Sequence, residues 1–168
     1  MNESVETRKR VVVDGQWDGN VIPGTIDELL RQVVVRSGAH VTGGVFGHRV
    51  RIEGPCDINR TVYATKEVEL APSGDISLGS CLGARDQVIA HPENGRILVS
   101  GDVVGRSINL SGAVVRGSVH GDEVRLHNSV VLGLVQASDV AEIANSQILS
   151  ADARTLRFGK ACGLILPY

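Results

Sequence analysis

The stretch VSGDVVG spans residues 99–105, and its seven-residue pattern recurs as VRGSVHG at 115–121 and as VLGLVQA at 131–137. The copies begin sixteen residues apart. Each copy is followed at the same distance by an apolar residue, namely Ile108, Val124 and Val140. A fixed short period means that the chain stacks copies of one structural unit on itself. The repeat therefore predicts a β-solenoid.

The spacing within each copy predicts the shape of one coil. Small or branched residues occupy every second position, which places them on one face of a strand. The five-residue step from Val119 to Val124 breaks this alternation and predicts a corner. Sixteen residues at about 3.3 Å each give three sides of about five residues. Gly101, Gly117 and Gly133 would relieve crowding inside this narrow section or permit a tight bend.

Looser copies of the pattern precede the regular stretch, at 41–47 and 58–64, and a degenerate copy begins at Ile76. Together they predict one column of inward residues through the stack. Its members are Val33, Val50, Val68, Val88, Ile108, Val124, Val140 and Leu156. With the segment before Val33 counted as well, we expect about eight coils.

The left-handed hexapeptide β-helix is the rival architecture, and it needs an aliphatic residue at every sixth position. Between Val115 and Val131 the aliphatic residues are instead spaced by four, five, two and five positions. Crossovers between parallel strands are right-handed by default. We therefore expect an all-β fold, a single-stranded right-handed parallel β-helix of roughly triangular section.

The chain divides into one solenoid with distinct ends. We expect a flexible tail at 1–10, an N-terminal coil and capping segment at 11–32, the β-helix at 33–158 and an apolar C-terminal segment at 159–168. Residues 25–32 predict a short helical turn, because Thr25 and Glu28 have the spacing of a capping box.

Composition excludes several function classes. A formal net charge of −2 gives no electrostatic reason to expect nucleic acid. The chain shows no long apolar run, and its first ten residues are mostly charged or polar, so neither a membrane span nor a secretory signal is expected. Three scattered cysteines form no disulfide framework, which favours a cytoplasmic location.

Residues that could carry chemistry are spread along the repeat. Of the five histidines, only His91 and His127 share a column, and two coils separate them by about 9.6 Å, too far to share one zinc ion. Acidic residues recur near the corners, at Asp102, Asp122, Glu123, Asp139 and Glu142. Paired catalytic carboxylates would need a substrate groove, and a solvated face is the simpler interpretation. We predict no catalytic, cofactor-binding or metal-binding residue, no cofactor, and no enzyme activity.

Three segments carry a family resemblance: GAHVTGGVFGHRVRIEG (38–54), TVYATKEVELAPSGDI (61–76) and SGAVVRGSVHGDEVRLHNSVVLGLVQA (111–137). Through them the chain resembles the bactofilins, a family of small polymer-forming cytoskeletal proteins, over roughly residues 33–158. The resemblance implies assembly into filaments without nucleotide, through end-to-end contact of the β-helices. It also implies a scaffold role whose partners are copies of the chain and other scaffold or cell-envelope proteins.

The sequence departs from the family in ways that affect partners. Some bactofilins have an apolar N-terminal membrane anchor, whereas residues 1–10 here are mostly charged or polar and do not support membrane binding. The helical segment at 25–32 and the insertions near 79–97 are also atypical of the family.

A solenoid exposes unpaired backbone groups at its two ends, where another β-edge can bind. We therefore predict a polymer interface at both ends. It comprises Val11, Val13 and Trp17 at one end, and Leu156, Phe158, Leu164, Ile165 and Leu166 at the other. The alternatives are a hexapeptide-type transferase or carbonic-anhydrase-like enzyme with a groove between subunits, and an adaptor that does not polymerise.

Overall fold

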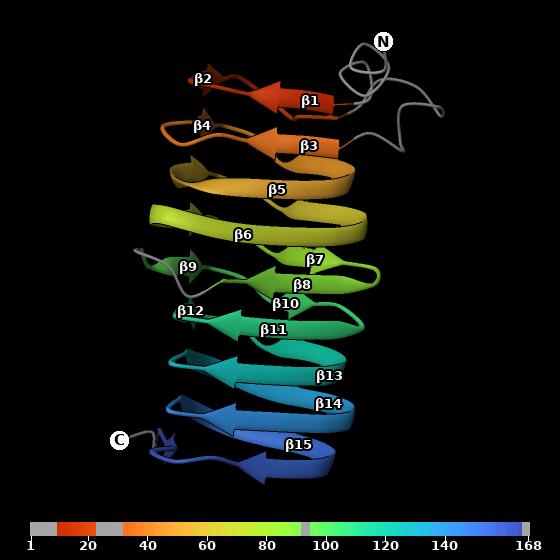
Figure 1. Ribbon diagram of the computed structural model, residues 1–168, viewed down its shortest axis with the longest axis vertical. Helices are drawn as coiled ribbons and strands as arrows, with labels where there is room; N and C mark the ends of the chain where they lie inside the picture. Colours follow the sequence, from red (N-terminus) through yellow and green to blue (C-terminus); the bar gives the residue numbers. More distant parts are fainter. Residues whose placement is uncertain (1–9, 23–31, 92–94, 166–168) are drawn as a thin grey trace, which may run out of the picture.

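The computed structural model describes residues 10–22, 32–91 and 95–165, and in these residues every element is a strand (Figure 1). The strands are β1 (Arg10–Val13), β2 (Gln16–Trp17), β3 (Gln32–Val35), β4 (His40–Val41), β5 (Val45–Ile58), β6 (Val62–Leu78), β7 (Leu82–Ala84), β8 (Gln87–Ala90), β9 (Ile97–Val99), β10 (Val103–Val104), β11 (Ser107–Ser111), β12 (Ala113–Val115), β13 (Val119–His127), β14 (Val130–Ala144), β15 (Gln147–Phe158) and β16 (Gly163–Leu164). The helical turn predicted at 25–32 lies outside the described residues except for Gln32, which begins β3.

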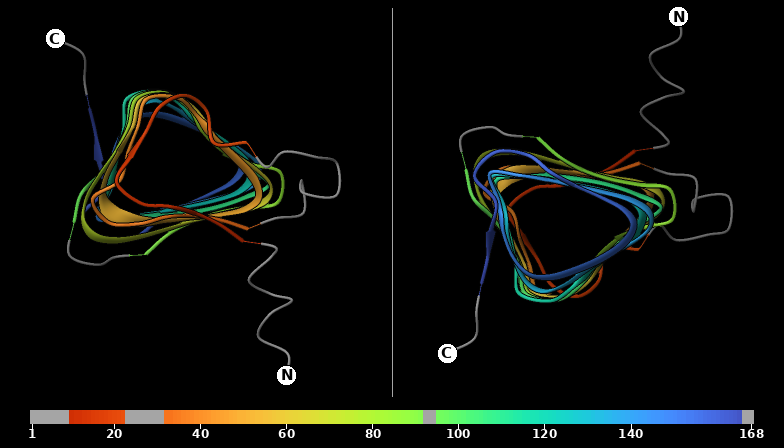
Figure 2. Two further views of the ribbon diagram at one scale, coloured as in Figure 1. Left: turned by 90° about the horizontal axis from the view of Figure 1, so that it is seen from above. Right: turned by 90° about the horizontal axis from the view of Figure 1, so that it is seen from below.

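The strands wind into one continuous β-helix, and the pairings between its successive coils are parallel throughout the described chain. Near-side strands in Figure 1 run from right to left while successive coils descend from β1 to β15, so the coil is right-handed. Viewed along its axis, the coil has a triangular section (Figure 2). The predicted right-handed, triangular parallel β-helix is confirmed.

Each coil contributes two inward positions to each of three faces. The first face stacks Val33 and Val35 on Val50 and Ile52, and the second stacks Ala39 and Val41 on Cys56 and Ile58. The third face has eight rungs among the described residues: Val21, Val45, Val62, Leu82, Val103, Val119, Val135 and Ala151. About eight coils were predicted, and the stack confirms this number. Most inward side chains have less than 3% of their surface exposed, so the core is a narrow aliphatic column.

The predicted inward column is right at every position except Val140. Val124 pairs with Ala141, and Ala141 pairs with Leu156. Gly121 faces Ala137, but Glu123 faces Val140, so β14 carries one extra residue at its corner. This bulge turns Val140 out of the column and places Ala141 in the core.

Glycines at one corner allow successive coils to approach closely. A Cβ added at Gly133 would lie 2.5 Å from the carbonyl oxygen of Gly117, and one added at Gly117 would lie 2.6 Å from that of Gly101. The crowding that these glycines relieve therefore lies between the backbones of successive coils, rather than inside the triangular section as predicted.

Candidate functional site at the ends of the coil

The final coil (residues 150–165) exposes side chains that occupy core columns. Leu156 is 39% exposed and Phe158 is 53% exposed, although both point in the inward direction of the first face. Their counterparts in the preceding coil, Ala141 and Ile143, are 0% and 1% exposed. No described coil covers the final one, so its core residues form an open apolar surface at the end of the stack.

The outer backbone edge of the final coil is also available for strand pairing. From Ser150 to Phe158, β15 pairs with β14, while β16 contacts β15 only at Gln147 and Ile148. Nine residues of β15 therefore lack a strand neighbour on their outer edge within the described chain. Such an edge is a template for pairing with another strand.

A shallow hollow of about 400 Å³ lies beside this edge. Its lining residues are Phe158, Gly159, Ala161, Cys162, Gly163 and Leu164. Leu164 is 64% exposed, the highest value among the large hydrophobic side chains that the structure describes. The end of the coil is therefore apolar and slightly concave.

The opposite end differs, as Figure 1 shows with β1 at the top of the stack and β15 at the bottom. Val13 is 0% exposed and Val11 is partly buried, so β1 presents little of its core column to solvent. Trp17 is 39% exposed, and its indole nitrogen donates a hydrogen bond to the carbonyl oxygen of Asn20 at 3.4 Å. Open core residues are concentrated at the C-terminal end.

The structure brings the predicted interface residues together as two groups at opposite ends. In the N-terminal group, Val13 belongs to the core and Trp17 to the surface. In the C-terminal group, Leu156, Phe158 and Leu164 share the exposed end, and Ile165 is partly buried beside them. Leu166 lies outside the described residues.

An ion-pair ladder reaches the final coil on the outer side of the first face. Arg157 Nη1 lies 2.7 Å from Glu142 Oε1, and Arg125 Nε lies 3.1 Å from Glu142 Oε2. The hydrogen bonds from Arg157 and then Arg125 lower the pKa of Glu142 below its ordinary value. The ladder holds Arg157 of the final coil against Glu142 of the preceding coil.

His91, His127 and Asp102 each have a separate local partner. His91 Nε2 lies 3.3 Å from Glu69 Oε1, while His127 Nε2 lies 3.3 Å from Asn145 Nδ2. Asp102 accepts a hydrogen bond from the backbone nitrogen of Ser118 at 2.7 Å and thus supports a corner. Across the described ranges, no group of three His, Cys, Asp or Glu side chains has a metal-binding arrangement.

The three cysteines are unpaired. Cys56 is buried, and burial together with the charge of Asp57 raises the pKa of its thiol to about 12. Cys81 and Cys162 are partly buried. Cys56 therefore packs in the core cluster as a small hydrophobic residue.

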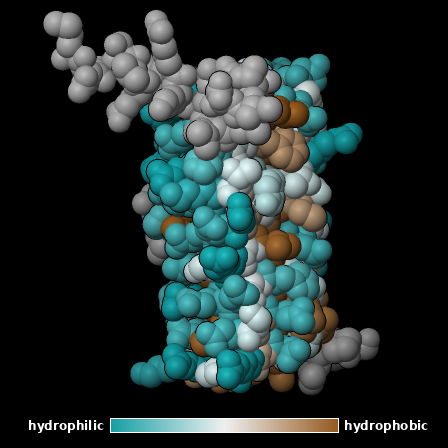
Figure 3. Space-filling model, turned by 90° about the vertical axis from the view of Figure 1, so that its right-hand side faces the viewer, coloured by the Kyte–Doolittle hydropathy of each residue, from teal (hydrophilic) through white to brown (hydrophobic). Residues whose placement is uncertain are grey.

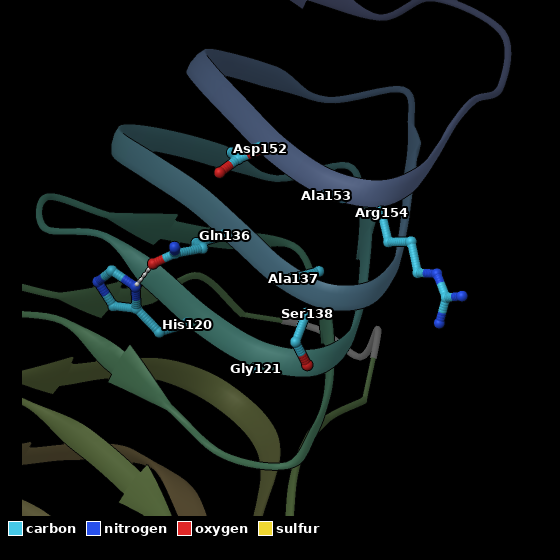
Figure 4. A pocket seen from close by; sticks show the side chains of 8 residues that line it. All are labelled: His120, Gly121, Gln136, Ala137, Ser138, Asp152, Ala153 and Arg154. Atoms are coloured by element: carbon cyan, nitrogen blue, oxygen red, sulfur yellow. Dashed lines mark hydrogen bonds between the residues drawn. The ribbon is translucent and has the colours of Figure 1, made fainter.

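Sequence reasoning missed a polar groove near the C-terminal end (Figure 4). The groove encloses about 340 Å³ and is lined by His120, Gly121, Gln136, Ala137, Ser138, Asp152, Ala153 and Arg154. The repeat contained a signal for it, because His120, Gln136 and Asp152 follow one another at sixteen-residue intervals. That spacing marks a single outward column on the third face.

Comparison with protein-family models, curated proteins and solved structures finds no match to the chain. Within the described ranges there is no helix of the length and apolar character needed to cross a bilayer.

Proposed function

We propose that the chain is a structural protein that self-associates end to end without nucleotide, as its resemblance to the bactofilins implies. The observation that carries this proposal is the open final coil, where Leu156, Phe158 and Leu164 are 39%, 53% and 64% exposed. The same inward columns are almost fully buried in the preceding coils. The proposed role is structural and assigns no catalysis to the chain.

Contact with a second copy would bury the exposed apolar side chains of this end and pair the outer edge of β15. Full burial of a large aliphatic or aromatic side chain contributes about 1.5–3 kcal/mol, so three half-exposed side chains supply a substantial part of an association energy. The outer edge of β15 would pair with a strand of the second copy. The flank of the coil in Figure 3 is mostly hydrophilic, which favours contact at the end over contact along this flank.

The three unpaired cysteines support a reducing, cytoplasmic setting for this assembly.

The experiment compares two apolar-to-charged substitutions at similarly exposed positions. Phe158→Lys changes the end of the coil, whereas Leu132→Lys changes a lateral residue that is 45% exposed. Purified wild type and both variants are examined by sedimentation velocity over a range of concentrations and by negative-stain electron microscopy, without nucleotide. Circular dichroism and thermal unfolding verify that each variant is folded.

We expect wild type and Leu132→Lys to form elongated assemblies whose width matches one coil, and Phe158→Lys to remain monomeric. A strictly monomeric wild type at high concentration would refute self-association and favour an adaptor. Equal loss of assembly in Phe158→Lys and Leu132→Lys would place the contact between copies on the flank. A discrete dimer that depends on Phe158 would keep the end contact and refute polymerisation.

A further inference from the structure

The polar groove crosses three successive coils at the corner between the third and first faces. Gly121, Ala137 and Ala153 form its floor, one from each coil, and Cα register pairs the first with the second and the second with the third. Neighbouring coils are spaced by about 4.8 Å, so the groove runs along the coil axis for about 10 Å. These three positions point toward the core, where Ala137 is 3% exposed and Ala153 packs against the core cluster, so the floor is formed by backbone between two outward columns.

The two walls of the groove carry different hydrogen-bonding groups. Gln136 and Asp152 stand on one side, and Arg154 extends from the final coil on the other (Figure 4). His120 Nδ1 lies 3.1 Å from Gln136 Oε1, which leaves the amide nitrogen of Gln136 facing solvent. Within the described chain, neither Asp152 nor Arg154 takes part in an ion pair.

This set of groups constrains the chemistry of a ligand. A carboxylate only accepts hydrogen bonds and a guanidinium only donates them, whereas an amide does both. Hydroxyl groups match such a mixture because each of them donates and accepts. A phosphate is disfavoured by the carboxylates of Asp152 and Asp122, the latter bound to Ser138 Oγ at 2.6 Å. A single carboxylate on the ligand would instead pair with Arg154 in a bidentate manner.

The spacing of the groups along the groove makes an extended peptide a poor fit. Side chains on one face of an extended peptide repeat at about 6.6 Å, twice the rise of about 3.3 Å per residue. The groups on the groove wall repeat at the coil spacing of about 4.8 Å. An extended glycan repeats once per sugar ring, and the length of this repeat is close to the coil spacing.

We propose that this groove binds a short glycan that carries one carboxylate, with sugar hydroxyls on Gln136 and Asp152 and the carboxylate on Arg154. The groove length accommodates about two sugar units, estimated as about 10 Å divided by the coil spacing of about 4.8 Å. The proposal does not depend on self-association, since all the lining residues belong to one copy of the chain.

The test uses cellobiouronate, a disaccharide with one carboxylate, as the acidic probe and cellobiose as the neutral one. Saturation-transfer difference NMR detects the bound sugar even if the protein assembles, and titration gives its dissociation constant. The variants are Arg154→Gln and Asp152→Asn. The matched control is Arg116→Gln, which changes an exposed arginine that lies outside the groove and forms no ion pair among the described residues.

We expect the wild type and Arg116→Gln to bind cellobiouronate, and each groove variant to bind it roughly tenfold more weakly, the effect of losing a hydrogen bond to a charged group. Cellobiose should bind the wild type more weakly than cellobiouronate, and its binding should be insensitive to Arg154→Gln. Absence of cellobiouronate binding, or binding that Arg154→Gln leaves unchanged, would overturn the proposal. Sedimentation of the same samples reports self-association separately, so each proposal fails on its own measurement.

Discussion

The hydroxyl oxygen of Ser129 lies 3.2 Å from the backbone nitrogen of Ala113 in the preceding coil and accepts its hydrogen bond. The same hydroxyl donates to the carbonyl oxygen of His127 at 2.9 Å. Ser146 repeats this arrangement one coil later, accepting from the nitrogen of Ser129 at 3.1 Å and donating to the carbonyl of Ala144 at 2.7 Å. Two buried serines therefore join three successive coils at one corner.

Replacing Ser129 should destabilise the coil because it leaves the buried N–H of Ala113 without an acceptor. We expect Ser129→Ala to lower the free energy of unfolding by about 1–3 kcal/mol. Ser111→Ala is the control, because the buried Ser111 hydroxyl has no hydrogen-bond partner among the described residues, and its loss should be neutral or stabilising. Urea denaturation measures the free energy of unfolding of both variants. Equal destabilisation by the two substitutions would contradict the role given to Ser129.

The serine corner shows where sequence periodicity succeeds and where it fails. The pairs Asn128-Ser129 and Asn145-Ser146 are seventeen residues apart, so a search at sixteen does not align them. Both asparagines adopt a φ of 49°, a left-handed conformation that asparagine tolerates well at a sharp corner. The conformational role of this residue pair becomes evident only once the corner is seen.

The inward column could be predicted because core packing requires an aliphatic residue at each turn. The exception arises from a local insertion: seventeen residues separate Val124 from Ala141, and fifteen separate Ala141 from Leu156, which together equal two periods. The prediction therefore failed at Val140 and recovered at Leu156. The apolar C-terminal end was predictable from the same columns, whereas the groove depends on how outward columns separate at a corner, which spacing alone does not reveal.

Crowding at Gly133 gives a second test of the coil geometry. A Cβ at this position would lie 2.5 Å from the backbone oxygen of Gly117, and neither coil can move without disturbing its neighbours. We expect Gly133→Ala to cost about 1–3 kcal/mol, as other overpacking substitutions do. Gly163→Ala is the control, since its added Cβ would have its nearest contact at 3.8 Å. Its effect on unfolding in dilute protein should stay within about 0.5 kcal/mol.

The ladder at Glu142 predicts how stability depends on pH. Hydrogen bonds from Arg157 and Arg125 lower the folded-state pKa of Glu142 below its ordinary value of 4.5. A depressed carboxyl pKa contributes stability above the unfolded-state pKa, and the contribution disappears as pH falls through the folded-state pKa. Because Glu142 is 36% exposed, we expect Glu142→Gln to lose less than about 1 kcal/mol at pH 7.

The melting temperatures of wild type and Glu142→Gln should therefore differ at pH 7 and converge as the pH falls below about 4. Differential scanning fluorimetry at several pH values measures this difference. A gap that widens toward acid pH would show that the ladder does not stabilise the charged form of Glu142.

The cysteines offer chemical reporters for the core and for the end of the coil. Burial raises the pKa of Cys56 to about 12, so at pH 8 only about one thiol in ten thousand is in the reactive thiolate form. We expect a maleimide to leave Cys56 unmodified in the folded protein and to label it after denaturation. Cys162 lines the hollow at the final coil, so its labelling should respond to whatever covers that end.

Labelling of Cys162 should fall as protein concentration rises through the range in which assemblies form, because the second copy covers the hollow. Cys81 is partly buried at a site remote from the final coil, so its labelling should be independent of concentration. In Phe158→Lys, Cys162 should be labelled at the same rate in dilute and concentrated samples. Site-resolved mass spectrometry distinguishes the three thiols. If Cys162 labelling did not change with concentration while wild-type assemblies formed, the contact between copies would lie away from the final coil.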